Sequence, residues 1–170
     1  MLSKKMEKAI NDQMNAEFYS SYLYLAMSAY FESVGLGGCA NWMRMQAQEE
    51  WFHGMKMFHF VNERGGRVKL QKIDEPASEW KSTLDVFENV LAHERKVTGL
   101  INDLVDKALD EKDHASNIFL QWFVTEQVEE EDTASGIVDK LKFIGKDASA
   151  LFALDQELGT RVFAPPATKV

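Results

Sequence analysis

The chain contains 170 residues, 45% of them hydrophobic, and carries a formal net charge of −8 at pH 7. This length favours a single domain with a substantial core, and the negative charge argues against a nucleic acid as a partner, because nucleic-acid binding calls for basic patches. No apolar run approaches the roughly 20 residues of a membrane span, the N-terminal segment lacks the apolar core of a signal peptide, and the single cysteine, Cys39, excludes an internal disulfide and fits a reducing cytoplasm.

Most of the chain is expected to be helical. The composition is rich in Ala, Leu, Met, Glu, Lys and Gln, which favour helix, and the chain contains only three prolines. Ser3 is suited to cap the first helix, and Gly35, Gly65 and Gly145 stand where helices would end. We expect four long helices and a short fifth helix, over about residues 3–33, 39–64, 82–111, 115–144 and 148–158.

The connection between the second and third helices has no helical periodicity. Residues 67–81 contain Pro76 and only isolated apolar side chains, and they can run the length of a bundle at about 3.3 Å per extended residue. Short connections join the other long helices in pairs, which predicts two antiparallel hairpins. The sequence therefore predicts an all-α four-helix bundle with a long crossover and a short fifth helix. Residues 1–159 would form one domain and residues 160–170 a flexible tail.

Glu50 and His53 are the most informative pair in the chain. They are three residues apart, so on a helix they share one face. Met43 and Met57 lie on the same face and are residues typical of a core. A carboxylate and an imidazole in an apolar interior are costly unless they are paired or bind a metal. Glu-x-x-His on an inward helix face is typical of carboxylate-bridged di-iron bundles, although the motif alone is a weak signal.

Four glutamates each lie in the middle of an apolar stripe that should face the core. Each has apolar side chains seven residues before and after it, which is about two helical turns. With their flanking residues they are Glu17 (Ile10, Tyr24), Glu50 (Met43, Met57), Glu94 (Phe87, Ile101) and Glu130 (Phe123, Ile137). Converging carboxylates would repel one another and their pKa values would rise unless cations neutralised them. A metal cluster inside the bundle is the economical explanation.

Six segments, found in this order, make the chain resemble the ferritin family, and specifically the prokaryotic non-haem ferritins. The resemblance covers about residues 1–158. It rests on residues 11–17 (NDQMNAE), 19–24 (YSSYLY), 47–53 (AQEEWFH), 93–94 (HE), 119–123 (FLQWF) and 126–131 (EQVEEE). It implies a ferritin-like arrangement for the predicted bundle.

The same resemblance implies a di-iron centre inside each subunit. Glu17, Glu50 and His53 would hold the first iron. Glu50 would bridge to a second iron, which Glu94 and Glu130 would also hold. Carboxylates and imidazole suit iron, and open coordination positions admit oxygen.

Other residues acquire roles from the resemblance. Gln127 would lie beside the second iron, near dioxygen or its product, and Tyr24 would pack against the centre. Trp122 resembles a nearby aromatic residue that supplies an electron. A third iron site on the cavity side would be formed by Glu49, Glu126, Glu129 and Glu130.

The activity implied by the resemblance is iron storage and detoxification. The protein would act as a ferroxidase that oxidises Fe(II) with dioxygen or hydrogen peroxide. The Fe(III) would be stored as a ferric oxyhydroxide mineral in the cavity of a hollow homo-oligomer, commonly of twenty-four subunits.

Two alternatives stay open. A di-iron peroxidase or redox protein of the rubrerythrin kind would have the same fold and little storage, but rubrerythrins usually add an iron site with four cysteines and this chain has one. A non-catalytic bundle would satisfy its buried carboxylates with Lys, Arg and water. Bacterioferritin is disfavoured because Gln127 and Glu130 replace its second Glu-x-x-His, and Trp51 replaces its haem-ligating methionine, so no haem is predicted.

Overall fold

The computed structural model describes residues 1–165, which form α-helices and contain no β-strand. The five helices of this described part are α1 (Lys4–Ser33), α2 (Gly37–Glu63), α3 (Thr83–Asp110), α4 (His114–Ile144) and α5 (Ala148–Leu158). Each predicted boundary lies within two residues of the observed one. Among these helices, none combines the length and the apolar character needed to cross a membrane.

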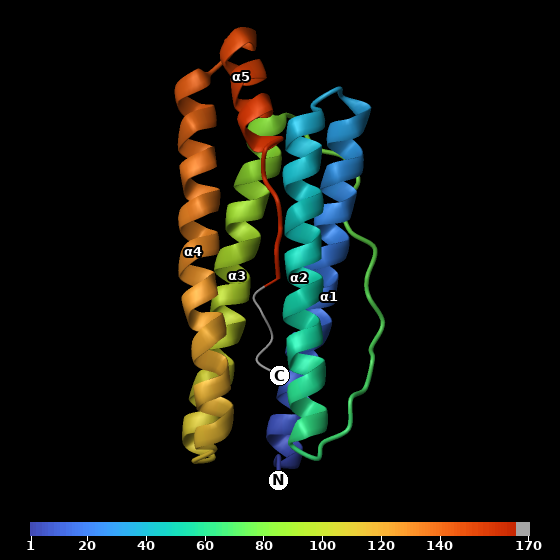
Figure 1. Cartoon of the computed structure of the whole chain (residues 1–170), viewed down its shortest axis with the longest axis vertical. Coiled ribbons are helices and arrows are strands. Elements are labelled where there is room, and N and C mark those ends of the chain that lie inside the picture. Colours follow the sequence, from blue (N-terminus) through green and yellow to red (C-terminus); the bar gives the residue numbers. More distant parts are fainter. Residues whose placement is uncertain (166–170) are drawn as a thin grey trace.

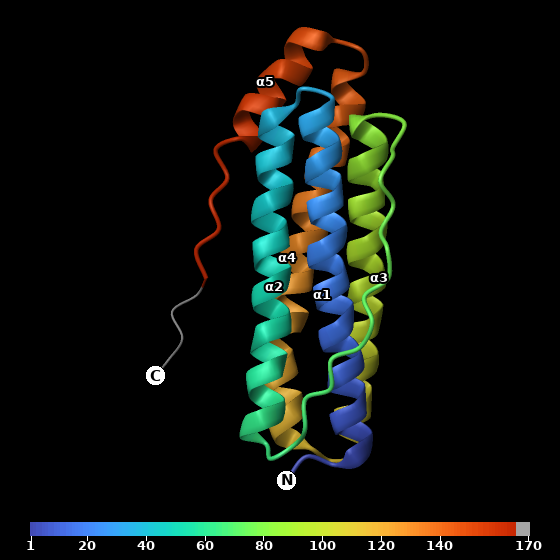
Figure 2. The same cartoon turned by 90° about the vertical axis from the view of Figure 1, so that its right-hand side faces the viewer.

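The four long helices form a bundle of two antiparallel hairpins, α1 with α2 and α3 with α4 (Figure 1). Residues 64–82 connect the hairpins and run from one end of the bundle to the other across α1 (Figure 2). Asn11 holds this crossover by donating to the carbonyl of Arg67 and accepting from the N–H of Lys69. The crossover makes α3 parallel to α2, so the predicted all-α four-helix bundle with a long crossover and a short fifth helix is confirmed.

Side chains cap four of the five described helices, and Ser3 caps α1 as predicted. Ser3 accepts a hydrogen bond from the N–H of Met6 at 3.0 Å, and Ser82, Asp113 and Asp147 cap α3, α4 and α5 in the same way. Each such side chain satisfies an N–H group that has no partner within its helix. The glycines after α1, α2 and α4 adopt positive φ angles, which L side chains rarely do.

Helix α2 begins at Gly37, two residues before the predicted start at Cys39. Gly37 and Gly38 were expected to lie in the connection before this helix, but both belong to α2, and Gly38 lies where α2 packs against α5. A Cβ atom built on Gly38 would lie 1.6 Å from the carbonyl oxygen of Asp155. The glycine therefore lets α5 approach the start of α2, and the Asp155 carboxylate accepts a 2.8 Å hydrogen bond from the N–H of Cys39.

The interior of the bundle contains two separate apolar clusters. One lies at the α5 end and includes Phe31, Trp42 and Phe87. The other lies toward the opposite end and includes Met6, Ile101 and Leu120. The predicted carboxylates lie between these clusters, at mid-height of the bundle.

Candidate metal centre

Each long helix contributes one glutamate to the layer between the apolar clusters. Glu17 comes from α1, Glu50 from α2 and Glu94 from α3, and each is 1% exposed. Glu130 comes from α4 and its side chain is 8% exposed. His53, one turn after Glu50, is equally buried. Because the stripes of all four helices face the same axis, carboxylates far apart in sequence converge.

Three compact groups of possible ligands occur in residues 1–165. In each group one ligand atom per residue lies within 4.8 Å of the others. The first group combines Glu17, Glu50 and His53, and the second combines Glu50, Glu94 and Glu130. Glu50 belongs to both, so it can bridge two ions. These two groups contain the same residues that the sequence analysis assigned to the two irons.

His53 lies at the centre of the acidic layer. Its Nδ1 atom is 3.5 Å from Glu50 Oε2 and 3.9 Å from both Glu17 Oε2 and Glu130 Oε1. The imidazole ring packs edge-on against Trp122, with ring centroids 5.2 Å apart. Nδ1 therefore faces the carboxylates while an aromatic wall fixes the ring plane.

Buried amides and a phenol orient the carboxylates. Gln13 donates to Glu17 Oε1 at 2.8 Å, and Gln46 donates to Glu50 Oε1 at 3.2 Å. Tyr24 donates to one oxygen of Glu94, and Gln127 donates to the other at 3.3 Å. Partners of this kind hold metal-ligating carboxylates in place.

Two buried carboxylate oxygens remain without a hydrogen-bond partner in the described part of the chain. They are Glu17 Oε2 and Glu130 Oε2, and both are buried. A buried oxygen of this kind costs free energy unless a cation or a proton meets it. Both glutamates belong to compact ligand groups, which is the arrangement expected of ligands.

Burial raises the pKa of the Glu50, Glu94 and Glu130 carboxyl groups, because desolvation penalises the charged form. The charges of Glu94 and Glu17 raise the pKa of Glu50 further, and those of Glu50 and Glu94 raise that of Glu130. Burial and the neighbouring carboxylates also raise the pKa of Tyr24, so its hydroxyl stays a donor. Without cations the layer therefore retains protons, and cations can replace them.

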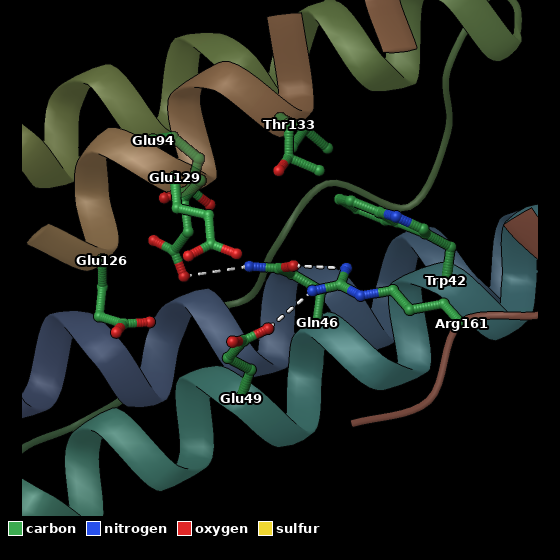
Figure 3. Close-up of a pocket in the computed structure, with 10 residues that line it drawn as sticks. Trp42, Gln46, Glu49, Glu94, Glu126, Glu129, Thr133 and Arg161 are labelled. Carbon is green, nitrogen blue, oxygen red and sulfur yellow. Dashed lines mark hydrogen bonds and ion pairs between the residues drawn. The ribbon is translucent and has the colours of Figure 1, made fainter. Parts of the chain in front are cut away.

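The residues predicted to form a third site, Glu49, Glu126, Glu129 and Glu130, lie on α2 and α4. The third compact group joins Glu49 and Glu130 with His53. Glu126 and Glu129 line the adjacent pocket but are absent from the three compact groups of residues 1–165 (Figure 3). The residues expected at this site thus share one opening, and Glu49 and Glu130 lie nearest to the centre.

Sequence reasoning missed three residues of the site: Gln13, Gln46 and Arg161. The two glutamines each precede a candidate ligand by four residues, so they share its helix face, and this spacing was a usable signal. Arg161 reaches Glu49 and Gln46 from a segment more than 100 residues away. No local pattern indicates such a contact.

The fold and the site define a class of protein: a four-helix bundle with a buried, carboxylate-rich layer whose residues could hold metal ions. The family model for the ferritin-like domain matches residues 7–144. The chain belongs to the ferritin family.

Relatives of known description cover almost the whole chain. A bacterial non-heme ferritin of Bacteroides fragilis (strain 638R) is 50% identical over 161 residues, which are 95% of this chain and 100% of the relative. A probable bacterial non-heme ferritin-like protein of Haemophilus influenzae is 46% identical over 94% of this chain and 96% of its own length. The predicted relationship to prokaryotic non-haem ferritins is therefore confirmed.

Solved structures agree with this assignment. A ferritin of Archaeoglobus fulgidus engineered into a closed form superposes with a TM-score of 0.96 at 58% identity, covering 96% of this chain and 100% of that one. An open pore ferritin from the same archaeon gives a TM-score of 0.94 at 57% identity, covering 95% and 100%. The likeness thus extends to the complete fold.

Proposed function

We propose that the protein stores and detoxifies iron by oxidising Fe(II) at the centre inside each subunit and retaining the Fe(III) as a mineral. The observation that carries this proposal is the pair of compact ligand groups that share Glu50. Two cations held this closely can deliver two electrons to one acceptor. Family membership and the bacterial non-heme ferritins among the relatives support the same activity.

In the proposed site, Glu17, Glu50 and His53 hold the first Fe(II), and Glu50, Glu94 and Glu130 hold the second. Carboxylates and a neutral imidazole are suitable ligands for iron. The cations that replace the protons of the carboxyl groups compensate the mutual repulsion of the carboxylates. Anionic ligands favour Fe(III) over Fe(II), because the higher charge gains more from them.

In the proposed reaction, a pair of Fe(II) ions supplies the two electrons that reduce one oxidant molecule. Each Fe(II) loses one electron, and one dioxygen molecule accepts both and takes up two protons to give hydrogen peroxide. Hydrogen peroxide can in turn accept two electrons from a further pair of Fe(II) ions and take up two protons to give two water molecules. Gln127 and Tyr24, both bonded to Glu94, fix the second position while the oxidant approaches.

The Fe(III) is proposed to leave by the third position, formed by Glu49, Glu126, Glu129 and Glu130. There it passes to the cavity of a homo-oligomeric shell, with twenty-four subunits as the expected number. Hydrolysis then deposits ferric oxyhydroxide and releases protons. We place this activity in the cytoplasm, in keeping with the single buried cysteine.

The first test is aerobic oxidation of Fe(II) by metal-free protein, titrated in steps and followed by ferric absorbance. We expect a fast phase that saturates at two or three irons per chain, followed by slow uptake of many more. Protein preloaded with Zn²⁺, which is redox-inert, should lose the fast phase. Fast oxidation without later uptake would point to a redox enzyme, and a rate equal to that of buffer would overturn the proposal.

A further inference from the structure

Arg161 lines the opening beside the candidate metal centre, and the proposed function gives it no role. It follows α5 in a segment that runs along α2 (Figure 1). Its Nη2 atom is 2.6 Å from Glu49 Oε2, and its Nη1 atom donates to Gln46 Oε1 at 2.7 Å. Its guanidinium carbon lies 4.4 Å from the centre of the Trp42 ring. A salt bridge, a hydrogen bond and a stacking contact thus fix one cation.

The opening itself lies between α2 and α4. Within residues 1–165, the backbones of these helices do not approach within 8 Å of each other at any Cα pair, whereas α1 approaches α2 and α3 approaches α4. Two pockets lie along this gap, and both are lined by Glu49, Glu126, Glu129 and Arg161. One pocket also reaches Glu130 and the other reaches His53. Arg161 therefore lines both pockets, and its side chain points toward Glu49 and Gln46 (Figure 3).

The Arg161 guanidinium places a positive charge beside a carboxylate that could also bind a metal ion. Glu49 takes part in the compact ligand group with His53 and Glu130, yet one of its oxygens already binds Arg161. Glu130 belongs to the same group, and its Oε2 atom has no hydrogen-bond partner among the described residues. Lys56, another nearby cation, lies over the Trp122 ring. Among the described residues, Arg161 is thus the cation that forms an ion pair with Glu49.

Partial burial makes this ion pair more than a surface contact. The side chains of Arg161 and Glu49 are 24% and 20% exposed. Two cations that share one carboxylate repel each other, and the repulsion is strong where water is partly excluded. By linkage, the charge that lowers the affinity for a metal ion is itself held less tightly once the ion is bound.

We propose that Arg161 is an internal counter-ion that competes with a metal ion for Glu49 at the opening between α2 and α4. An ion at the third position, whether arriving or leaving, displaces the guanidinium from Glu49. Arg161 thereby weakens retention at this position more than at the buried pair, whose bridging ligand Glu50 it reaches through Gln46. This inference rests on the proposed function, because it concerns the route by which iron reaches or leaves the centre.

Binding of Zn²⁺ to the metal-free full-length protein in its native assembly tests this inference without any oxidation. Calorimetry would count the ions per chain and give an affinity for each class of site. Arg161→Gln removes the charge while keeping a hydrogen-bonding side chain, and Arg161→Lys keeps the charge as a matched control. We expect Arg161→Gln to bind the weakest class about tenfold more tightly, with a smaller change at the tight pair and with Arg161→Lys close to the unaltered protein.

A crystal structure of the unaltered protein loaded with Zn²⁺ gives a second, independent readout. We expect the ion to lie against Glu49 and the Arg161 guanidinium to have left it. An ion on Glu49 with the ion pair intact, or a weak class that Arg161→Gln leaves unchanged or weakens, overturns the competition. Absence of the tight pair in the unaltered protein would instead overturn the proposed function, so the two failures are distinguishable.

Discussion

The acidic layer at mid-height of the bundle and the apolar clusters on either side of it are formed by the same four helices. In the apolar clusters, buried side chains such as Phe87 and Leu120 gain stability by leaving water. In the acidic layer, equally buried glutamates lose hydration and repel one another. The apolar clusters therefore stabilise the fold. The acidic layer between them costs free energy of folding without cations, which is expected of a functional site.

The largest effect on stability is expected in the apolar clusters. Leu120 is fully buried, and Leu120→Ala should lower the free energy of unfolding by about 2–5 kcal/mol, because it removes buried methyl groups and leaves a cavity. Leu109 is 52% exposed, and Leu109→Ala serves as the matched control with a much smaller loss. Denaturant unfolding of the metal-free proteins, all at the same protein concentration, measures the free energy of unfolding of both variants. Equal losses would contradict the assignment of stability to the buried clusters.

The reverse pattern is expected for Glu50, which belongs to both buried ligand groups. Glu50→Gln keeps the shape and can still accept from Gln46, but it removes a charge. We expect the rate of the fast Fe(II) oxidation to fall by about 100-fold or more, beyond the usual effect of losing an outer hydrogen-bonding partner. The metal-free variant should be no less stable, because a repelled carboxylate has gone.

Stopped-flow oxidation and denaturant unfolding of the same Glu50→Gln preparation check both parts of this prediction. Glu63→Gln, on the exposed end of the same helix, is the control and should retain the unaltered rate. Retained fast oxidation in Glu50→Gln would remove Glu50 from the proposed pair of sites. A large loss of metal-free stability would show that the carboxylate stabilises the fold.

Proton binding gives a third contrast between the layer and the clusters. Burial raises the pKa of Glu50, Glu94 and Glu130 above the usual 4.5, so above that pH the folded state holds protons that the unfolded state has released. The stability of metal-free protein should therefore fall as pH rises from 4.5 through the folded pKa values. Metal ions displace the same protons, so their affinity should rise with pH, by up to about tenfold per pH unit for each proton displaced.

Melting curves with and without Zn²⁺ at about pH 5.5 and about pH 7.5 test this contrast. The increase in melting midpoint caused by Zn²⁺ should be larger at the higher pH. Variants in which Glu50 and Glu130 are both changed to Gln should show a smaller difference between the two values. A Zn²⁺ effect that is independent of pH would contradict proton displacement from the buried layer.

Much of the fold was predictable because its signals are local. The apolar stripes, capping side chains and helix-ending glycines define the helices to within two residues, and the breaker-rich segment around Pro76 indicates the crossover. Gly37 and Gly38 misled the prediction of the start of α2. Glycine is common in turns, but the missing side chain of Gly38 lets the α5 backbone approach α2. No local pattern encodes this contact between distant segments.

The candidate site shows the same division between local and distant information. The centring of Glu17 and Glu130 in apolar stripes predicted that they would be buried and converge, and the structure brings them together. Gln46 could have been found from its spacing to Glu50. Arg161 could not, because its position depends on α5 and on the course of the chain after it. Residues 166–170 of the expected flexible tail lie outside the described residues, while Phe163 contacts Met45 on α2.

The smallest effect is expected at Tyr24, which belongs to both regions. Its ring is part of the apolar cluster at the α5 end, while its hydroxyl donates to Glu94 in the acidic layer. Tyr24→Phe keeps the ring and removes one of the two donors of Glu94, leaving Gln127. Because a hydrogen bond to a charged group contributes about 1.5–3 kcal/mol and Gln127 retains part of the orientation, we expect a loss of at most this size in metal-free stability.

The effect of Tyr24→Phe on binding separates orientation from ligation. If the hydroxyl only orients Glu94, the count of Zn²⁺ per chain stays unchanged and the affinity at the second position falls by a few-fold, because Glu94 must be ordered when the ion binds. Tyr22→Phe, on the exposed face of the same helix, is the matched control and should change neither quantity. Loss of one bound ion would mean that the phenol determines whether the second position exists. Tyr24 would then belong to the acidic layer in function as well as in contact.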